Sequence, residues 1–173
     1  MKRPVFISIM CFFFMMFMSL GVWAQEPPVV SRDVRGNEHV VSEHILSATG
    51  MKIGEPLNRE QLQKDVEAIY ELGFFSFVDV DLAVVEGGVG VTYVVKENPV
   101  VDKIEFSGNT VYSDEDLLKL VFTAPGAVFN RVFFRHDLER IQEKYQKDGY
   151  VMTRIADVQI EGGIINVQIM EPI

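Results

Sequence analysis

The sequence predicts an α+β protein built from two β-α-α-β-β units, each a three-stranded mixed sheet with two helices on one face. Three observations predict this class. Landmark residues recur in the same order in both halves, helical and strand periodicities follow one another in each half, and a glycine pair separates the last two apolar runs of each half. We expect unit 1 to span residues 25–100 and unit 2 to span residues 101–173.

The internal repeat is the strongest feature of the chain. Gly36-Asn37 recurs 72 residues later (108 − 36) as Gly108-Asn109. The other recurring landmarks are Asn58 and Asn130, Asp65 and Asp137, Gly73 and Gly149, Gly87-Gly88 and Gly162-Gly163, and Glu97 and Glu171. So many landmarks in one order predict two copies of one supersecondary unit.

A short apolar strand should open each unit, at about Val29–Arg35 and Lys103–Ser107. The glycine and asparagine that follow, Gly36 with Asn37 and Gly108 with Asn109, are expected to form tight structural turns, because both residue types tolerate positive φ.

Two helices should follow in each unit. The expected N-caps are Ser42 and Ser113 for a first short helix, and Asn58 and Asn130 for a longer second helix. Apolar residues at helical spacing form the stripe of the second helix: Leu62, Val66, Ile69 and Tyr70 in unit 1, and Phe134, Leu138, Ile141 and Tyr145 in unit 2. Gly73 and Gly149 stand where these helices should end.

Two strands should close each unit, joined at the glycine pairs. Apolar residues alternate with polar ones, which indicates one buried face. The expected inward residues of the second strand are Val78, Val80, Leu82 and Val84 in unit 1, and Met152, Ala156, Val158 and Ile160 in unit 2. In the third strand they are Val89, Val91, Tyr93 and Val95, and Ile165, Val167 and Ile169.

The N-terminus has the three-part pattern of a secretory signal. Lys2 and Arg3 precede an uncharged apolar run over residues 5–22, and Ala24 completes a cleavage site before Gln25. We expect residues 1–24 to be removed; the alternative is an uncleaved membrane anchor, since about 18 apolar residues can just span a bilayer. Removal takes away Cys11, the only cysteine, and changes the formal charge from −9 to −11 (−9 − 2).

Composition and spacing exclude several functions. A strongly acidic surface repels phosphate backbones, so we expect no nucleic-acid partner. His39, His44 and His136 lack metal-ligand spacing, so no metal and no other cofactor is expected. Asp79 and Asp81 could form an acid–base pair, but their alternation with apolar residues favours a solvated strand face. We therefore expect neither an enzyme nor a small-molecule substrate.

The ordered set of motifs, present twice, resembles the POTRA domains of the outer-membrane protein assembly factor family (BamA, also called YaeT). The resemblance rests on residues 104–110 (IEFSGNT), 145–150 (YQKDGY), 95–99 (VKENP) and 72–78 (LGFFSFV), and it covers about residues 29–173. It implies an exported, periplasmic module at the bacterial outer membrane that receives unfolded β-barrel proteins, together with assembly and chaperone partners.

The family also implies a C-terminal β-barrel in the outer membrane, and no run of alternating transmembrane strands follows the second unit up to Ile173. A fragment of a longer protein, a truncated gene product and a free-standing POTRA pair remain alternatives. Two other functions also remain: an inner-membrane-anchored POTRA scaffold of the FtsQ type, and the POTRA pair of a two-partner secretion transporter.

The mechanism that fits such a module is β-augmentation, in which an extended peptide adds to an open sheet edge. The resemblance implies that the second strand of each unit is an edge, over residues 77–84 and 151–160. The residues predicted to bind a partner are Phe77, Val78, Asp79, Val80, Asp81 and Leu82, and Val151, Met152, Thr153, Arg154, Ile155 and Ala156. Proline at Val80 or Ala156 should block such binding, because proline has no N–H to donate.

Overall fold

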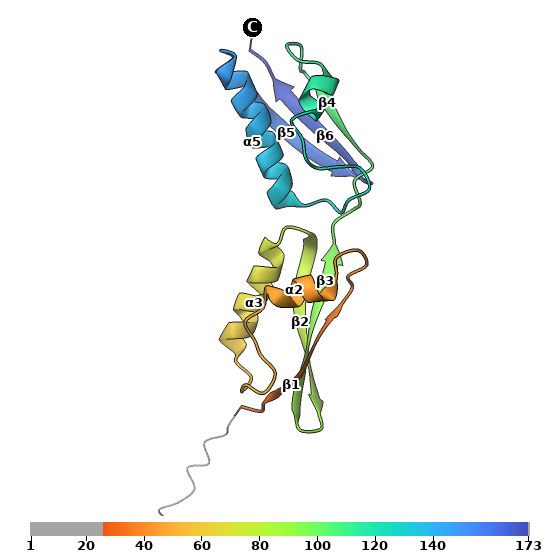
Figure 1. Ribbon diagram of the computed structural model, residues 1–173, viewed down its shortest axis with the longest axis vertical. Coiled ribbons are helices and arrows are strands. Elements are labelled where there is room, and N and C mark those ends of the chain that lie inside the picture. Colours follow the sequence, from red (N-terminus) through yellow and green to blue (C-terminus); the bar gives the residue numbers. More distant parts are fainter. Residues whose placement is uncertain (1–25, 173) are drawn as a thin grey trace, which may run out of the picture.

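The computed structural model describes residues 26–172 and contains the two predicted β-α-α-β-β units, one above the other in Figure 1. Unit 1 comprises β1 (Val29–Arg35), α2 (Ser42–Ser47), α3 (Arg59–Glu71), β2 (Phe75–Val85) and β3 (Gly88–Glu97). Unit 2 comprises β4 (Lys103–Ser107), α4 (Asp114–Leu118), α5 (Arg131–Lys147), β5 (Arg154–Glu161) and β6 (Ile164–Met170). The predicted signal segment lies outside the described residues, among which no helix is long and apolar enough to cross a membrane.

Both sheets are mixed, with the last strand of the unit in the middle. Their orders are β1-β3-β2 and β4-β6-β5. The central strand runs parallel to the first strand and antiparallel to the second, with Val34 opposite Tyr93 and Val80 on the other side of Tyr93 in unit 1. Since β3 and β6 occupy the centres, β2 and β5 each have one neighbouring strand and one open side among residues 26–172.

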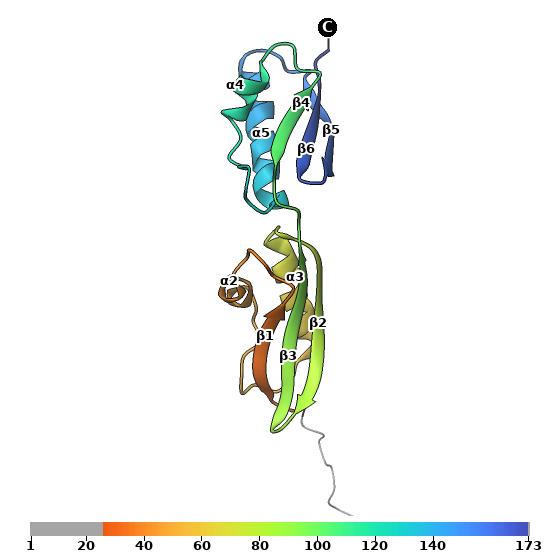
Figure 2. The same cartoon turned by 90° about the vertical axis from the view of Figure 1, so that its right-hand side faces the viewer.

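The helices of each unit cover one face of its sheet, as the turned view in Figure 2 shows. In unit 1, Ile45 of α2 and Ile69 of α3 are fully buried with Val91 and Tyr93 of the central strand. In unit 2, Leu117, Ile141, Ile165 and Val167 form the matching core. Each such side chain contributes about 1.5–3 kcal/mol of transfer free energy to folding.

The turn after the first strand depends on its glycine. Gly36 and Gly108 have φ of +93° and +78°. A Cβ at either position would collide with a carbonyl oxygen of the central strand, that of Val95 or Ile169. Of the two residues in each turn only the glycine has positive φ, and the asparagines do not adopt the conformation that they tolerate. Their side chains bridge the turn instead, each donating to the carbonyl three residues later at 2.8 and 3.0 Å.

Three of the four predicted N-caps are confirmed. Asn58 accepts from the Gln61 N–H, Asn130 accepts from the N–H groups of Val132 and Phe133, and Ser113 accepts from the Asp116 N–H. The prediction for Ser42 is wrong, since it is the first residue of α2 and no side chain caps that helix. Its hydroxyl accepts a bond from the Asn37 amide at 3.1 Å instead, so Asn37 occupies the group that would have capped the helix.

The second strand of unit 2 starts later than predicted. Val151, Met152 and Thr153 precede β5, which begins at Arg154. The Thr153 N–H closes a turn on the Tyr150 carbonyl at 3.1 Å, and Gln142 of α5 donates to the Thr153 carbonyl at 2.6 Å. These bonds hold the segment against the end of the helix, so Val151 and Met152 lie on an exposed turn and not on the edge.

The inward-facing pattern of the edge strands also differs from the predicted one. The register of β5 shifts between Ile155 and Asp157, so Ala156 is a bulge residue and Ile155 packs against the core in its place, whereas Val158 packs inward as predicted. In unit 1, Val78 and Val80 pack against the core as predicted, whereas Leu82 and Val84 are exposed. The β2–β3 hairpin extends beyond the helices, which leaves its end uncovered (Figure 1).

Candidate functional site

Strand β2 has an open side, because it lies at one edge of its sheet. The strand has 11 residues and pairs with β3 on one side only. An edge of this kind presents a row of N–H and C=O groups to which another extended chain can bond. All six partner-binding residues predicted in unit 1 lie on this strand.

The backbone groups that face outward can be identified from one hydrogen bond. The Val80 N–H donates to the Asp79 carboxylate at 2.8 Å, beside the open edge. In an antiparallel ladder the N–H and C=O of one residue point to the same side, and alternate residues point to opposite sides. Val78, Val80 and Leu82 therefore direct backbone groups outward. Phe77, Asp79 and Asp81 bond toward β3 and contribute only side chains to the edge.

A partly apolar groove runs beside this edge, between α3 and β2. It has a volume of about 540 Å³, and its lining includes Val66, Tyr70, Phe77 and Val78 together with Glu67 and Glu71. Phe77 and Tyr70 are half exposed, at 51% and 41% of their surface. A strand added to β2 would place alternate side chains over this groove, where apolar ones would be removed from water.

The charged residues of the two edges have different partners. Asp81 forms an ion pair with Arg35, which reaches it from β1. In unit 2, Asp157 accepts from the Val158 N–H at 2.8 Å and from the Gln159 amide at 2.9 Å, and Arg154 contacts the Met170 sulfur. Charge at an edge discourages uncontrolled strand pairing, so both edges carry some protection against aggregation.

Unit 2 completes the C-terminal end of helix α3. The Arg131 guanidinium donates to the Tyr70 carbonyl at 2.5 Å, lies 3.9 Å from the centre of the Tyr70 ring and is 3.5 Å from the Glu71 carboxylate. The Asn130 amide donates to the Leu72 carbonyl at 2.8 Å. The last carbonyls of a helix have no partner within it. Asn130 supplies a donor to the Leu72 carbonyl, and Arg131 adds a second donor to the Tyr70 carbonyl, which also accepts the Gly73 N–H.

Further hydrogen bonds and an aromatic contact connect the two units at their junction. The Asn98 amide bridges the carbonyls of Gly73 and Phe129 at 2.9 Å each, and the rings of Phe74 and Phe133 meet edge to face at 6.1 Å. Because Tyr70 and Glu71 also line the groove beside β2, unit 2 holds one wall of the groove in unit 1.

One buried aspartate in each unit, Asp65 in unit 1 and Asp137 in unit 2, holds the loop before the second helix. Asp65 accepts from the N–H groups of Gly50 and Met51 at 2.7 and 3.1 Å, and from the Tyr93 hydroxyl at 2.5 Å. Burial and this hydroxyl bond raise the pKa of Tyr93 above its ordinary value. Asp137 accepts from the N–H groups of Phe122 and Thr123, both at 2.9 Å. The spacing of 72 residues (137 − 65) marks the two as equivalent but does not reveal this role.

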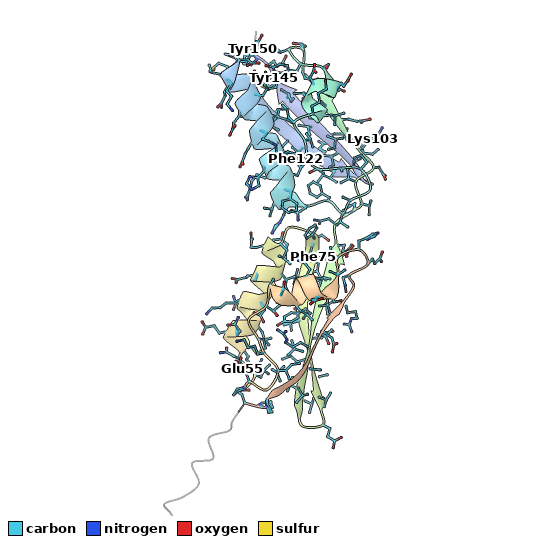
Figure 3. All side chains as sticks on the ribbon, viewed as in Figure 1. Glu55, Phe75, Lys103, Phe122, Tyr145 and Tyr150 are labelled. Atoms are coloured by element: carbon cyan, nitrogen blue, oxygen red, sulfur yellow. The ribbon has the colours of Figure 1, made fainter. Side chains whose placement is uncertain are left out.

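The repeated glutamates that end the central strands have a similar role. Glu97 accepts from the N–H groups of Glu38, His39 and Val40, and Glu171 accepts from those of Thr110 and Val111. Burial opposes ionisation of both groups, but these donors outweigh it and hold the pKa of each carboxyl below its ordinary value. The Tyr145 hydroxyl also donates to Glu171 at 2.6 Å, and Figure 3 shows Tyr145 beside Tyr150 at the end of α5.

The three histidines lie in separate settings. His39 contacts Glu97, His44 packs edge to face on Phe74, and His136 contacts Glu139 on its own helix. Within residues 26–172, no group of three or more potential metal ligands is present.

The geometry defines a tandem β-α-α-β-β module with an open second-strand edge in each unit. The family model POTRA, described as a surface antigen variable number repeat, matches residues 29–98 and again residues 99–171. The chain therefore belongs to the POTRA family.

Relatives agree with this assignment. The chain is 29% identical over 124 residues to the outer membrane protein assembly factor BamA of Nitratidesulfovibrio vulgaris, a match that covers 70% of this chain and 15% of BamA. Its fold is similar to the N-terminal domain of Omp85 from Thermosynechococcus elongatus, with a TM-score of 0.75 and 24% identity over 82% of this chain and 61% of that one. It is also similar to POTRA1-3 of the periplasmic domain of Omp85 from Anabaena, with a TM-score of 0.66 and 26% identity over 84% of this chain and 62% of that one.

Proposed function

We propose that this chain is a periplasmic protein-binding module of outer-membrane protein assembly, and that it receives extended segments of unfolded outer-membrane proteins by strand addition. The observation that carries the proposal is the open edge of β2 beside the groove lined by Val66, Tyr70 and Phe77. Backbone groups are common to all client proteins, so an edge suits a carrier of many sequences.

The relatives support the biological setting of this proposal. One is named an assembly factor of outer-membrane proteins, and another is described as a periplasmic domain. The chain matches a small part of the BamA sequence, so we assign binding, and not insertion into a membrane, to these two units. Assembly and chaperone proteins of the periplasm are the other partners that we propose.

Replacing Val80 by proline should block binding at the β2 edge. The Val80 N–H bonds the Asp79 side chain and not β3, so proline removes an outward donor without removing a bond of the sheet. A fluorescein-labelled nine-residue peptide of alternating valine and threonine serves as the probe. In fluorescence anisotropy, Val80→Pro should weaken its binding at least about tenfold, since one or two backbone bonds and the close approach of the strand are lost.

The matched control is Val158→Pro, the same change at the equivalent position of β5, where the Val158 N–H bonds Asp157. Because the bulge at Ala156 interrupts β5 two residues before this position, we expect this control to have the smaller effect. Unchanged binding to a folded Val80→Pro variant, verified by circular dichroism, would show that β2 is not the binding edge.

A further inference from the structure

Each edge strand carries an aspartate that occupies its own open side. The Asp79 carboxylate accepts the Val80 N–H at 2.8 Å, and the Asp157 carboxylate accepts the Val158 N–H at 2.8 Å. The two positions are equivalent, because Asp79 lies opposite Val94 and Asp157 lies opposite Gln168, each three residues before the glutamate that ends its unit (97 − 94 and 171 − 168). The contact is therefore a repeated feature of the fold and not an isolated surface bond.

This contact competes with strand addition. A carbonyl of an incoming strand can bond the Val80 N–H only after the Asp79 carboxylate has left it. The displaced carboxylate then lies beside the incoming strand, where directly opposed residues have Cβ atoms about 4.5–5.5 Å apart. A lysine or arginine opposite Asp79 would pair with the carboxylate, whereas a glutamate or aspartate would be repelled.

The two units differ in how firmly the aspartate is held. Asp157 uses its second oxygen to accept the Gln159 amide at 2.9 Å. Among the described residues, Asp79 has only the Val80 N–H as a partner and no cation within ion-pair distance, although its neighbour Asp81 is paired with Arg35. The β2 edge therefore presents an uncompensated negative charge where a strand would add.

The groove beside β2 adds to this negative potential. Glu67 and Glu71 line its α3 side, and Arg131 compensates Glu71 alone, at 3.5 Å. The apolar lining and the acidic rim together favour a strand that carries apolar residues on one face and a basic residue on the other.

We propose that Asp79 controls which strands add to β2: it caps the edge in the free protein and selects an extended segment with a lysine or arginine opposite it. The inference rests on the function proposed above and specifies its ligand. The occupant is a segment of an unfolded protein with alternating apolar residues and one basic residue. The β5 edge, whose aspartate is held by two groups, does not make this selection.

The test compares three peptides on the full chain. Each has nine residues of alternating valine and threonine, with the central threonine kept, replaced by lysine or replaced by glutamate. The single charged residue should place the peptide in one register along β2, with that residue opposite Asp79. In anisotropy at low salt, the lysine peptide should bind roughly three- to tenfold more tightly than the glutamate peptide, and the preference should shrink at high salt.

Variants of Asp79 separate its charge from its cap. Asp79→Asn keeps an oxygen acceptor without charge, so the lysine preference should fall to within about twofold, and the affinity for the neutral peptide should lie between those of wild type and Asp79→Ala. Asp79→Ala frees the Val80 N–H, so the neutral peptide should bind roughly two- to fivefold more tightly. Asp157→Asn is the matched control and should leave the lysine preference intact.

Two results would overturn the inference. In the first, the lysine and glutamate peptides bind wild type equally and Val80→Pro blocks both. Binding at the β2 edge would then stand, but Asp79 would have no selective role. A lysine preference that survives Asp79→Asn would assign the selection to other carboxylates. If Val80→Pro weakened the binding of none of the three peptides, that result would instead contradict the proposed function itself.

Discussion

Replacing Asp65 by alanine should lower the free energy of unfolding by about 3–5 kcal/mol, because it leaves several buried hydrogen-bond donors without an acceptor. The side chain is 1% exposed and accepts bonds from two backbone N–H groups, the Gln61 amide and the Tyr93 hydroxyl. Alanine would leave these buried donors without a partner, at about 1–3 kcal/mol for each group that water cannot reach.

Urea unfolding followed by circular dichroism measures this change. Asp137→Ala should have an effect of similar size in unit 2, because Asp137 is fully buried and accepts from Phe122 and Thr123. Glu60→Ala, on the exposed face of α3, is the control and should lower the urea midpoint only slightly, because an exposed ion pair such as that with Lys64 contributes little to stability. An Asp65→Ala midpoint equal to that of the control would show that the carboxylate does not hold the loop.

Gly36→Ala should cost about 3 kcal/mol. An L-residue at φ of +93° carries roughly 1–2 kcal/mol of backbone strain. The new Cβ would in addition collide with the Val95 carbonyl oxygen, and relieving such overlap costs about 1–3 kcal/mol. The turn that leads out of β1 would have to move away from the central strand.

Gly54→Ala separates these two contributions. Gly54 has φ of +91°, and a Cβ there would meet no atom within 4 Å. Thermal or urea unfolding should therefore show a loss of only about 1–2 kcal/mol for Gly54→Ala. Equal losses for the two variants would mean that the approach of Gly36 to β3 does not constrain the turn.

The parts of the fold that could be predicted from sequence depend on short-range contacts. Asn58 and Asn130 cap helices through bonds to residues two or three positions away, so the sequence alone locates them. Ser42 failed as a cap because α2 begins at Ser42 itself, one position earlier than the prediction required, and its hydroxyl accepts from the Asn37 side chain. The bulge at Ala156 could not be foreseen, because it depends on how β5 pairs with β6.

The candidate site shows the same division. The resemblance located the edge strand of unit 1, and its residues 77–82 lie on β2. The pairing of β2 with β3 determines which of their backbone groups face outward. It also determines that Asp79 caps one of these groups, the Val80 N–H. The contact of Arg131 with Tyr70 joins residues 61 positions apart in two units, and no local pattern reports it. Val151, Met152 and Thr153 were misplaced because their turn is held by Gln142, a contact made only in the folded unit.

The most direct test of the central claim, that β2 is a strand-accepting edge, is a nuclear magnetic resonance titration of the isotope-labelled chain with the lysine peptide. Strand addition predicts that the outward amides of Val78, Val80 and Leu82 shift most and become protected from hydrogen exchange, because they gain hydrogen bonds. The amides of Phe77 and Asp79, already bonded toward β3, should change less. Shifts confined to unit 2, or spread over the helices with no change along β2, would contradict the claim.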